Sequence, residues 1–176
     1  MRHAVAERMT VRNRLGRLDL FPDLPAVADT LPGYEALEWN GAGTLSSIDR
    51  PPLDPAMKAR VGLAVDARLK HRWTLLAGSS RRCLPKLVSQ LGSVDLFIHD
   101  SLHTQRNVLF ELQCVWPALR PGGVVVVDDI DSNAGYGLFL KRTSGFTSLV
   151  CEAEPVRPDT RRFNNKGLFG IILKDR

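Results

Sequence analysis

Residues 94–130 read VDLFIHDSLHTQRNVLFELQCVWPALRPGGVVVVDDI, and this stretch decides the fold. It begins with an apolar run at residues 94–98 and closes with a second one at 124–127. Between the runs, apolar residues recur at helical spacing until Pro121-Gly122-Gly123, which predicts a helix followed by a turn. The pattern is that of a βαβ unit.

Polar side chains follow both apolar runs. Asp100 and His103 come after the first run, and Asp128 and Asp129 come directly after the second. Strands buried on both faces read as unbroken β-branched runs, and open α/β sheets bind ligands outside the carboxyl ends of their strands. We therefore expect the four side chains to share one rim of the sheet. Helix capping by Asp100, and by Asp131 further on, is the alternative, but three converging carboxylates and a histidine favour a functional site.

The same alternation extends to both sides of this unit. A helix is expected at residues 55–69, another between Ser79 or Ser80 and Gly92, and a short one through residues 138–140. The last two strands have no helix between them, which indicates an antiparallel return at the sheet edge. We predict an α/β fold with a doubly wound, Rossmann-like, mostly parallel sheet. Its strands are expected at residues 44–48, 73–77, 94–98, 124–127, 147–152 and 166–174.

Composition places the chain among ordinary globular proteins. Its 176 residues are 44% hydrophobic and 24% charged, which fits one domain with a full core. No apolar run approaches the roughly 20 residues that span a membrane, and no secretory signal is apparent, so we expect a cytoplasmic protein without a membrane partner. Cys83, Cys114 and Cys151 lack metal-ligand spacing and are expected to be reduced, buried thiols.

The first 42 residues differ from the rest. They are rich in arginine and proline and lack periodicity, although residues 18–21 could form a short strand. The predicted organisation is an irregular or divergent segment at 1–42 followed by a Rossmann-like domain at 43–176. Genuine divergence and a shifted reading frame upstream of residue 35 would both produce this boundary.

Five segments carry a resemblance to a known family. In their order and spacing they are similar to class I S-adenosylmethionine-dependent methyltransferases, and most of all to the subgroup of macrocin-type sugar O-methyltransferases. The resemblance runs from about Gly43 to Lys174. The segments are GTLSSID at 43–49, LLAGSSRRCLPKL at 75–87, VDLFIHDSLHT at 94–104, LRPGGVVVVDDI at 119–130 and KGLFGIILK at 166–174.

The resemblance implies where the cofactor S-adenosylmethionine binds. Asp49 corresponds to the acid that accepts hydrogen bonds from the ribose hydroxyls, a task that suits a carboxylate because it can accept from both hydroxyls of a diol. Gly78 and Ser79 stand where the family contacts adenine, with serine in place of the commoner aspartate. Asp100 is also expected among the cofactor contacts.

The sugar-methylating relatives further imply a metal centre. Their D-x-x-H motif and paired acids correspond to Asp100, Asp128 and Asp129 as magnesium ligands, with His103 as the general base. Hard carboxylate oxygens suit magnesium, and a cation that acidifies and orients a hydroxyl would allow a histidine to remove its proton.

The family's first strand ends in an acid and a G-x-G loop, and residues 1–42 contain no such loop. We therefore expect the first strand and glycine loop to be absent or degenerate. The predicted function is O-methylation of a small-molecule or sugar hydroxyl; the alternative is a cofactor-free, methyltransferase-like binding or scaffold protein. The net charge of +5 is mostly scattered, so nucleic-acid binding is the least favoured hypothesis, and a homo-oligomer is left open.

Overall fold

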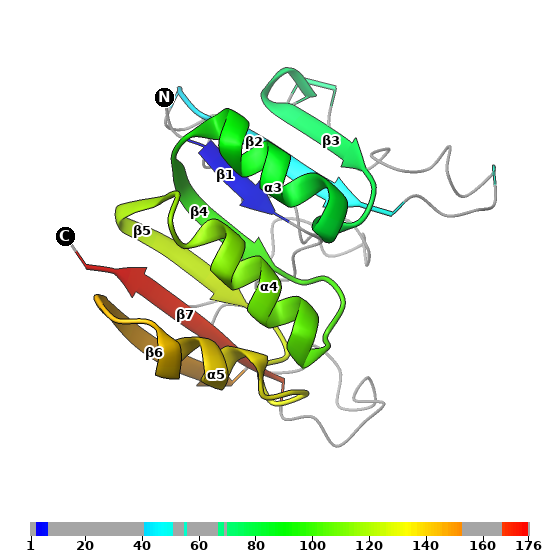
Figure 1. The fold of residues 1–176 in the computed structure, drawn as a ribbon. Helices are drawn as coiled ribbons and strands as arrows, with labels where there is room; N and C mark the ends of the chain where they lie inside the picture. The colour runs from blue at the N-terminus through cyan, green and yellow to red at the C-terminus, as the bar shows by residue number, and fades with distance from the viewer. Residues whose placement is uncertain are drawn as a thin grey trace.

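A computed structural model describes residues 3–6, 41–50, 55, 67–68, 70–152 and 167–175. The described residues form one seven-stranded sheet with the strand order β3-β2-β1-β4-β5-β7-β6 (Figure 1). The strands are β1 (His3–Ala6), β2 (Thr44–Asp49), β3 (Trp73–Ala77), β4 (Val94–His99), β5 (Leu119–Val127), β6 (Phe146–Glu152) and β7 (Leu168–Lys174).

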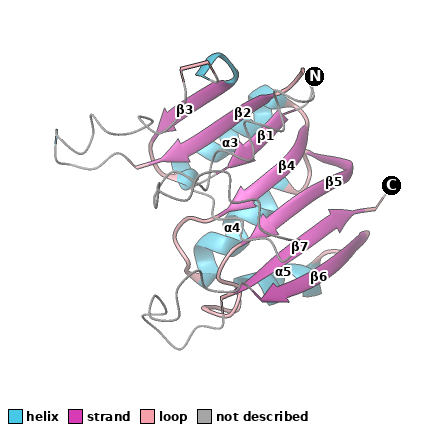
Figure 2. Ribbon diagram, turned by 180° about the vertical axis from the view of Figure 1, so that it is seen from behind, coloured by secondary structure: helices cyan, strands magenta, loops and turns pink. Residues whose placement is uncertain are grey.

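The direction of the strands confirms the predicted fold class. β3, β2, β1, β4 and β5 are parallel to one another, and β7 pairs antiparallel with both β5 and β6. β6 is the edge strand, so the last two strands form the expected antiparallel return. Because β2, β4 and β5 run in the same direction, their carboxyl ends meet at one edge of the sheet, as Figure 2 shows from behind.

Three described helices lie on one face of the sheet (Figure 1). The first of them ends at Leu91 and is followed by the predicted C-terminal glycine, Gly92, whose positive φ of 69° favours glycine. Most of the helix expected at 55–69 lies outside the described residues, so the second face of the doubly wound sheet stays a prediction. The helices are α3 (Ser80–Leu91), α4 (Gln105–Val115) and α5 (Gly135–Arg142), and a 3-10 turn, η1 (Lys70–Arg72), precedes β3.

The amino-terminal segment supplies a short central strand, so of the two expected outcomes, an absent or a degenerate first strand, the structure shows the second. β1 pairs in parallel with both β2 and β4, so that Ala4 lies opposite Leu45 on one side and Leu96 on the other. Without it, β2 and β4 would leave backbone groups unpaired inside the sheet, which is costly. β1 has only four residues, whereas the other strands have five to nine, so it is a degenerate first strand.

The sheet is therefore not confined to residues 43–176. The strand proposed at residues 18–21 and the place where a glycine loop would follow β1 both lie outside the described residues. The irregular character of the rest of the 1–42 segment stays a prediction.

The turn predicted at Pro121-Gly122-Gly123 was wrong in its position, because these residues lie within β5. The pairing of β4 with β5 shifts register there: Val94 pairs with Leu119, and the next pair joins Leu96 to Val124. Gly122 has a φ of 71°, a conformation that glycine adopts without steric cost. Gly122 therefore permits a β-bulge within β5. It does not form the turn that was predicted before the strand.

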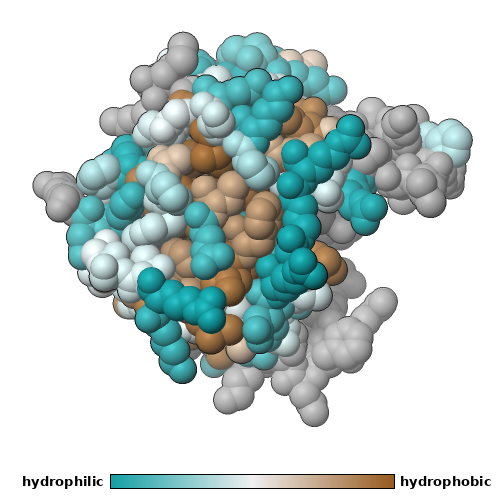
Figure 3. Space-filling view, viewed as in Figure 1, coloured by the Kyte–Doolittle hydropathy of each residue, from teal (hydrophilic) through white to brown (hydrophobic). Residues whose placement is uncertain are grey.

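The hydrophobic core lies between the sheet and the three helices. Seen from the helix side, apolar side chains gather in the middle of the face with hydrophilic ones around them (Figure 3). Each fully buried large apolar side chain contributes about 1.5–3 kcal/mol through removal from water. The largest apolar side chains with almost no exposure are Phe97, Phe139, Ile48, Leu84, Leu112, Leu119 and Ile172.

The three cysteines are free, as predicted, but they are half-buried rather than buried. Cys83 and Cys114 pack against the hydrophobic core from its margin. In the described part of the chain, no helix is long and apolar enough to cross a membrane.

One tight contact in the core gives a stability prediction. Gly170 of β7 packs against the ring of Tyr136, and a Cβ at this position would overlap ring carbons and lie 2.7 Å from the hydroxyl oxygen. Gly170→Ala should lower the free energy of unfolding by about 1–3 kcal/mol, because overpacking displaces a buried side chain. Urea denaturation measures the change. Gly137→Ala is the control: its Cβ would have nothing within 4 Å, so the same substitution in α5 should be neutral or stabilising.

Candidate functional site

The ends of β4 and β5 bring the predicted acids together. His99 and Val127 are the last paired residues of the two strands, and the amide of Asp128 donates a hydrogen bond of 2.9 Å to the carbonyl of His99. Asp100 and Asp128 are therefore the first residues beyond neighbouring parallel strands. The rim expected from the sequence is present in the structure.

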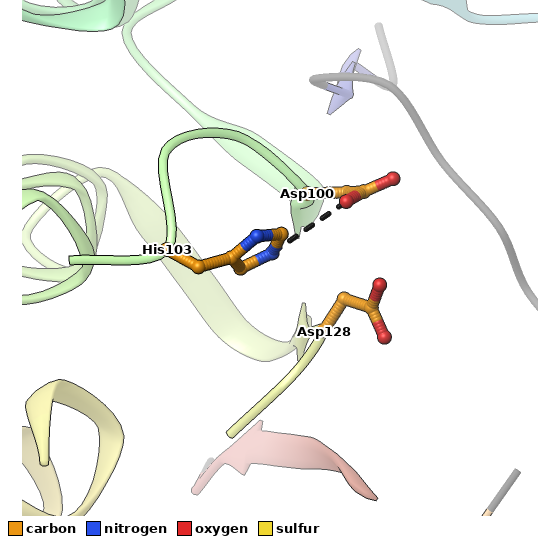
Figure 4. Close-up of side chains that lie close together, drawn as sticks. All are labelled: Asp100, His103 and Asp128. Carbon is orange, nitrogen blue, oxygen red and sulfur yellow. Dashed lines mark ion pairs between the residues drawn. The ribbon is translucent and has the colours of Figure 1, made fainter. Parts of the chain in front are cut away.

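The ring of His103 points toward Asp100 and Asp128 (Figure 4). Its Nε2 is 3.6 Å from Oδ1 of Asp100, and its Nδ1 is 3.9 Å from Oδ2 of Asp129. Both distances exceed that of a hydrogen bond, so these are electrostatic contacts. His103 Nε2 is buried and has no hydrogen-bond partner among the described residues, which leaves one ring nitrogen available for a ligand.

The capping alternative does not apply to either aspartate. Helix α4 is capped by Thr104, whose hydroxyl accepts a hydrogen bond of 3.3 Å from the amide of Asn107. At the start of α5, the side-chain oxygen of Asn133 accepts a hydrogen bond of 2.8 Å from the amide of Gly135. Asp100 is therefore not engaged as the cap of α4, and Asp131 is not the cap of α5.

The pKa of Asp128 is raised above its ordinary value. Burial raises its pKa, and the negative charge of Asp129 raises it further. A hydrogen bond from the backbone of Asp129 and the nearby His103 and His99 act in the opposite direction, but the pKa stays above the ordinary value. Ionised Asp128 thus lacks sufficient compensation for its burial, and a cation beside it would supply that compensation.

Three side chains meet the geometry of a metal site. One ligand atom each from Asp100, His103 and Asp128 can be chosen so that all lie within 4.8 Å of one another. Asp129, which the sequence resemblance placed among the ligands, is not part of this group. Its backbone has a φ of 48°, in the left-handed region that aspartate tolerates, and its carboxylate contacts the opposite nitrogen of His103.

The residues expected to contact the cofactor lie on the same rim, nearer the other edge of the sheet. Asp49 ends β2 and is exposed, and its carbonyl accepts a hydrogen bond of 2.9 Å from the amide of Gly78 beyond β3. Ser79 is the N-cap residue of α3, but its hydroxyl makes no capping hydrogen bond. In the strand order, β1 separates this group from Asp100.

A buried polar network beneath the rim had no predicted role. His99 and Glu111 are fully buried and hydrogen-bonded to each other, with Ser101 and Asn107 as further partners. The sequence does carry a signal for it. Glu111 lies three residues after Val108 and four before Val115, on the apolar stripe of α4, where a charged residue needs a buried partner.

A sequence model described as a methyltransferase domain matches residues 30–130, which is more than half of the chain. The chain belongs to this methyltransferase-domain family. The matched part of this methyltransferase domain includes all the candidate site residues, from Asp49 to Asp129.

Individual relatives agree with the family assignment. Demethylmacrocin O-methyltransferase from Streptomyces fradiae is 24% identical over 109 residues, a match that covers 56% of this chain and 25% of that protein. The present chain thus spans about a quarter of the length of this relative.

Solved structures share the fold. The O-methyltransferase TomG from Streptomyces achromogenes, in complex with SAM, superposes with a TM-score of 0.62 at 18% identity, over 99% of this chain and 74% of TomG. The methyltransferase MycE, in complex with Mg, SAH and mycinamycin VI, gives 0.55 at 13% identity, over 99% of this chain and 45% of MycE. At these identities the likeness is one of fold.

Proposed function

We propose that the chain is an S-adenosylmethionine-dependent O-methyltransferase that modifies a hydroxyl of a sugar or another small molecule with the help of a divalent cation. The observation that carries the proposal is the convergence of Asp100, His103 and Asp128 at the ends of two neighbouring strands. The MycE structure, which contains Mg, SAH and mycinamycin VI, supports the choice of cation and of substrate class.

The residues present fit a magnesium ion. Asp100 and Asp128 offer hard carboxylate oxygens, and magnesium is usually held by one or two carboxylates while it keeps water or substrate at its other positions. Burial and Asp129 raise the pKa of Asp128, so a cation would relieve an unfavourable ionisation. When bound, the cation would acidify and orient an acceptor hydroxyl. We also propose Asp129 as a third ligand of the cation.

His103 would act as the general base. Its buried Nε2 has no partner among the described residues and can accept the hydroxyl proton, while Asp129 near Nδ1 favours the tautomer with the proton on that nitrogen. The acceptor oxygen would then bond to the methyl carbon, and the carbon–sulfur bond would break with its electron pair remaining on sulfur. The proton would end on His103, whose positive charge Asp100 and Asp129 would stabilise.

The cofactor would bind at the ends of β2 and β3. Asp49 is exposed there and can accept hydrogen bonds from both ribose hydroxyls, while Gly78 and Ser79 would face the adenine. β2 and β4 are separated by one strand, which corresponds to about 10 Å at the usual strand spacing. An extended cofactor can cover that distance, so Asp100 could contact its far end.

Asp49→Ala tests the cofactor site. The variant should bind S-adenosylhomocysteine about 30- to 150-fold more weakly, since two hydrogen bonds to a charged acceptor contribute about 2–3 kcal/mol. Isothermal titration calorimetry measures the affinity. Asp175→Ala, which removes an exposed carboxylate beyond the end of β7, is the control and should bind like the wild type. Equal affinities for all three proteins would place the ribose elsewhere.

A cofactor-free binding or scaffold protein is the second candidate. It is favoured by one sequence observation, the lack of a G-x-G loop in residues 1–42. Such a protein would retain the fold and the acidic rim but show no saturable binding of S-adenosylmethionine or S-adenosylhomocysteine. The calorimetric titration of the wild type therefore separates the two candidates.

A further inference from the structure

A buried hydrogen-bond network, which has no part in the proposed reaction, joins the end of β4 to helix α4. Nδ1 of His99 lies 2.5 Å from Oε2 of Glu111, and neither side chain is exposed. The other carboxylate oxygen accepts hydrogen bonds of 2.8 Å from the Ser101 hydroxyl and 2.6 Å from the Asn107 amide. The Asn107 amide also donates to the Ser101 hydroxyl at 3.0 Å.

The hydrogen bonds of Glu111 are those expected of an ionised carboxylate, which can only accept. Burial would raise its pKa, but the hydrogen bond from His99, the charge of His99, and the hydroxyls of Ser80 and Ser101 lower it below the ordinary value. A carboxylate that only accepts requires its partners to donate. His99 must therefore carry a proton on Nδ1, and its Nε2 is buried without a partner among the described residues.

The network is connected to both ends of the loop that carries Asp100 and His103. His99 immediately precedes Asp100, and Ser101 immediately follows it. Asn107 donates its backbone amide to the capping hydroxyl of Thr104, the residue that follows His103. The rings of His99 and His103 meet edge to face, with centroids 5.5 Å apart. One carboxylate thus connects to both ends of residues 100–104.

Stability alone does not account for such a pair. A buried ion pair is commonly no better for stability than apolar side chains of the same volume, whereas an outer carboxylate that orients histidines and ligands beside a metal has a large effect on that site. The position of Glu111 directly below the loop points to the second role.

We propose that Glu111 is a positioning residue that acts through His99 and Ser101 to hold Asp100 and His103 in the arrangement needed to bind a cation and accept a proton. The inference rests on the proposed function of the rim. It assigns Glu111 no contact with substrate, cofactor or ion.

Glu111→Gln tests this inference with almost no change in volume. Glutamine can still accept hydrogen bonds from Ser101 and Asn107, but its amide group donates, so His99 must accept at Nδ1 and move its proton to Nε2. The affinity for Mn²⁺ should fall about 10- to 100-fold, as measured by calorimetry, while the affinity for S-adenosylhomocysteine stays that of the wild type. Ser101→Ala, which leaves the His99–Glu111 pair intact, should show a smaller loss of the same kind.

Asp95→Asn is the matched control. Asp95 is a carboxylate on the same strand and pairs with Arg120 at the opposite end of β4, so its loss changes stability without touching the rim. Thermal unfolding of both variants reports the stability effect. A parallel loss of Mn²⁺ and cofactor affinity in Glu111→Gln, in proportion to lost stability, would reduce Glu111 to a structural residue and overturn the inference.

A second readout does not depend on metal binding. The chain has four histidines, so long-range ¹H–¹⁵N spectra can follow each imidazole. In Glu111→Gln the His99 proton should move from Nδ1 to Nε2 and the His103 resonances should shift, whereas Asp95→Asn should alter neither. Unchanged His103 resonances would overturn the inference. If the wild type binds no Mn²⁺, the metal role proposed for the rim fails, and the His103 response still decides the role of Glu111.

Discussion

Replacement of His103 by alanine should lower kcat for methyl transfer by about 10²–10⁴-fold, the usual contribution of a positioned general base. The expected cause is the loss of Nε2, which is buried without a hydrogen-bond partner among the described residues and lies 3.6 Å from Oδ1 of Asp100. The assay is transfer of a labelled methyl group from S-adenosylmethionine to a hydroxyl acceptor. Cofactor affinity should stay close to that of the wild type, because Asp49 and Gly78 are unaffected.

His71→Ala is the matched control for this experiment. His71 lies on η1, is exposed, and its Nδ1 contacts the carbonyl of Arg68 at 2.6 Å, away from the rim. It should have wild-type turnover. If His103→Ala also retained wild-type turnover, the proton would have to leave by another group, and the role of His103 would be wrong.

Asp128→Asn should abolish tight binding of a divalent cation. Even the loss of a group that merely supports a metal ligand weakens affinity by about 10- to 100-fold, so loss of a direct carboxylate ligand should cost at least about 100-fold. Calorimetric titration with Mg²⁺ or Mn²⁺ measures this. Asp131→Asn, an exposed aspartate three residues further on, should bind the cation like the wild type. Identical isotherms for wild type and Asp128→Asn would contradict the metal site.

Asp128→Asn should stabilise the protein in the presence of EDTA, which removes divalent cations. The pKa of Asp128 is raised in the folded state, so the folded protein holds this proton more tightly than the unfolded chain does. Stability is therefore lost as pH rises from the unfolded pKa, about 4, through the higher folded pKa, and the loss is complete near neutral pH. Asp128→Asn should have the higher Tm at pH 7, and the difference should shrink toward pH 4. A lower Tm for the variant at pH 7 would show that ionised Asp128 is already compensated.

Much of the sheet follows from sequence because its strands are buried and parallel. The VVVV run at residues 124–127 is wholly apolar, and the run at 94–98 is apolar except for Asp95, a pattern typical of buried central strands. Once both strands are parallel neighbours, the proximity of Asp100 and Asp128 is a consequence of chain direction. The rim could thus be predicted without any knowledge of side-chain contacts.

β1 could not be predicted in the same way. HAVA has only four residues and is followed by no turn or helix pattern, so nothing local distinguishes it from the surrounding irregular sequence. Its place in the sheet comes from pairing with β2 and β4, which are more than thirty residues away. Tertiary pairing of this kind overrides local propensity.

The details of the site also depended on tertiary contacts. The sequence treated Asp129 as equivalent to Asp128, but Asp129 has a left-handed backbone and its carboxylate lies 3.9 Å from Nδ1 of His103. Likewise, Glu111 and His99 belong to different elements, and only their packing shows that they form a pair. Spacing along the chain predicts which residues reach the rim, whereas orientation depends on dihedral angles and on buried neighbours.

The proposed function requires the cofactor's methyl group and a divalent cation to meet at the carboxyl ends of β4 and β5. Mn²⁺-induced paramagnetic broadening of the proton resonances of bound S-adenosylmethionine tests it most directly, because the broadening falls steeply with distance. With the wild type, the sulfonium methyl protons should broaden more than the adenine protons, and Asp128→Asn should remove the difference. Adenine protons that broaden as much as the methyl protons, or no broadening by the wild type while the cofactor is bound, would contradict the account.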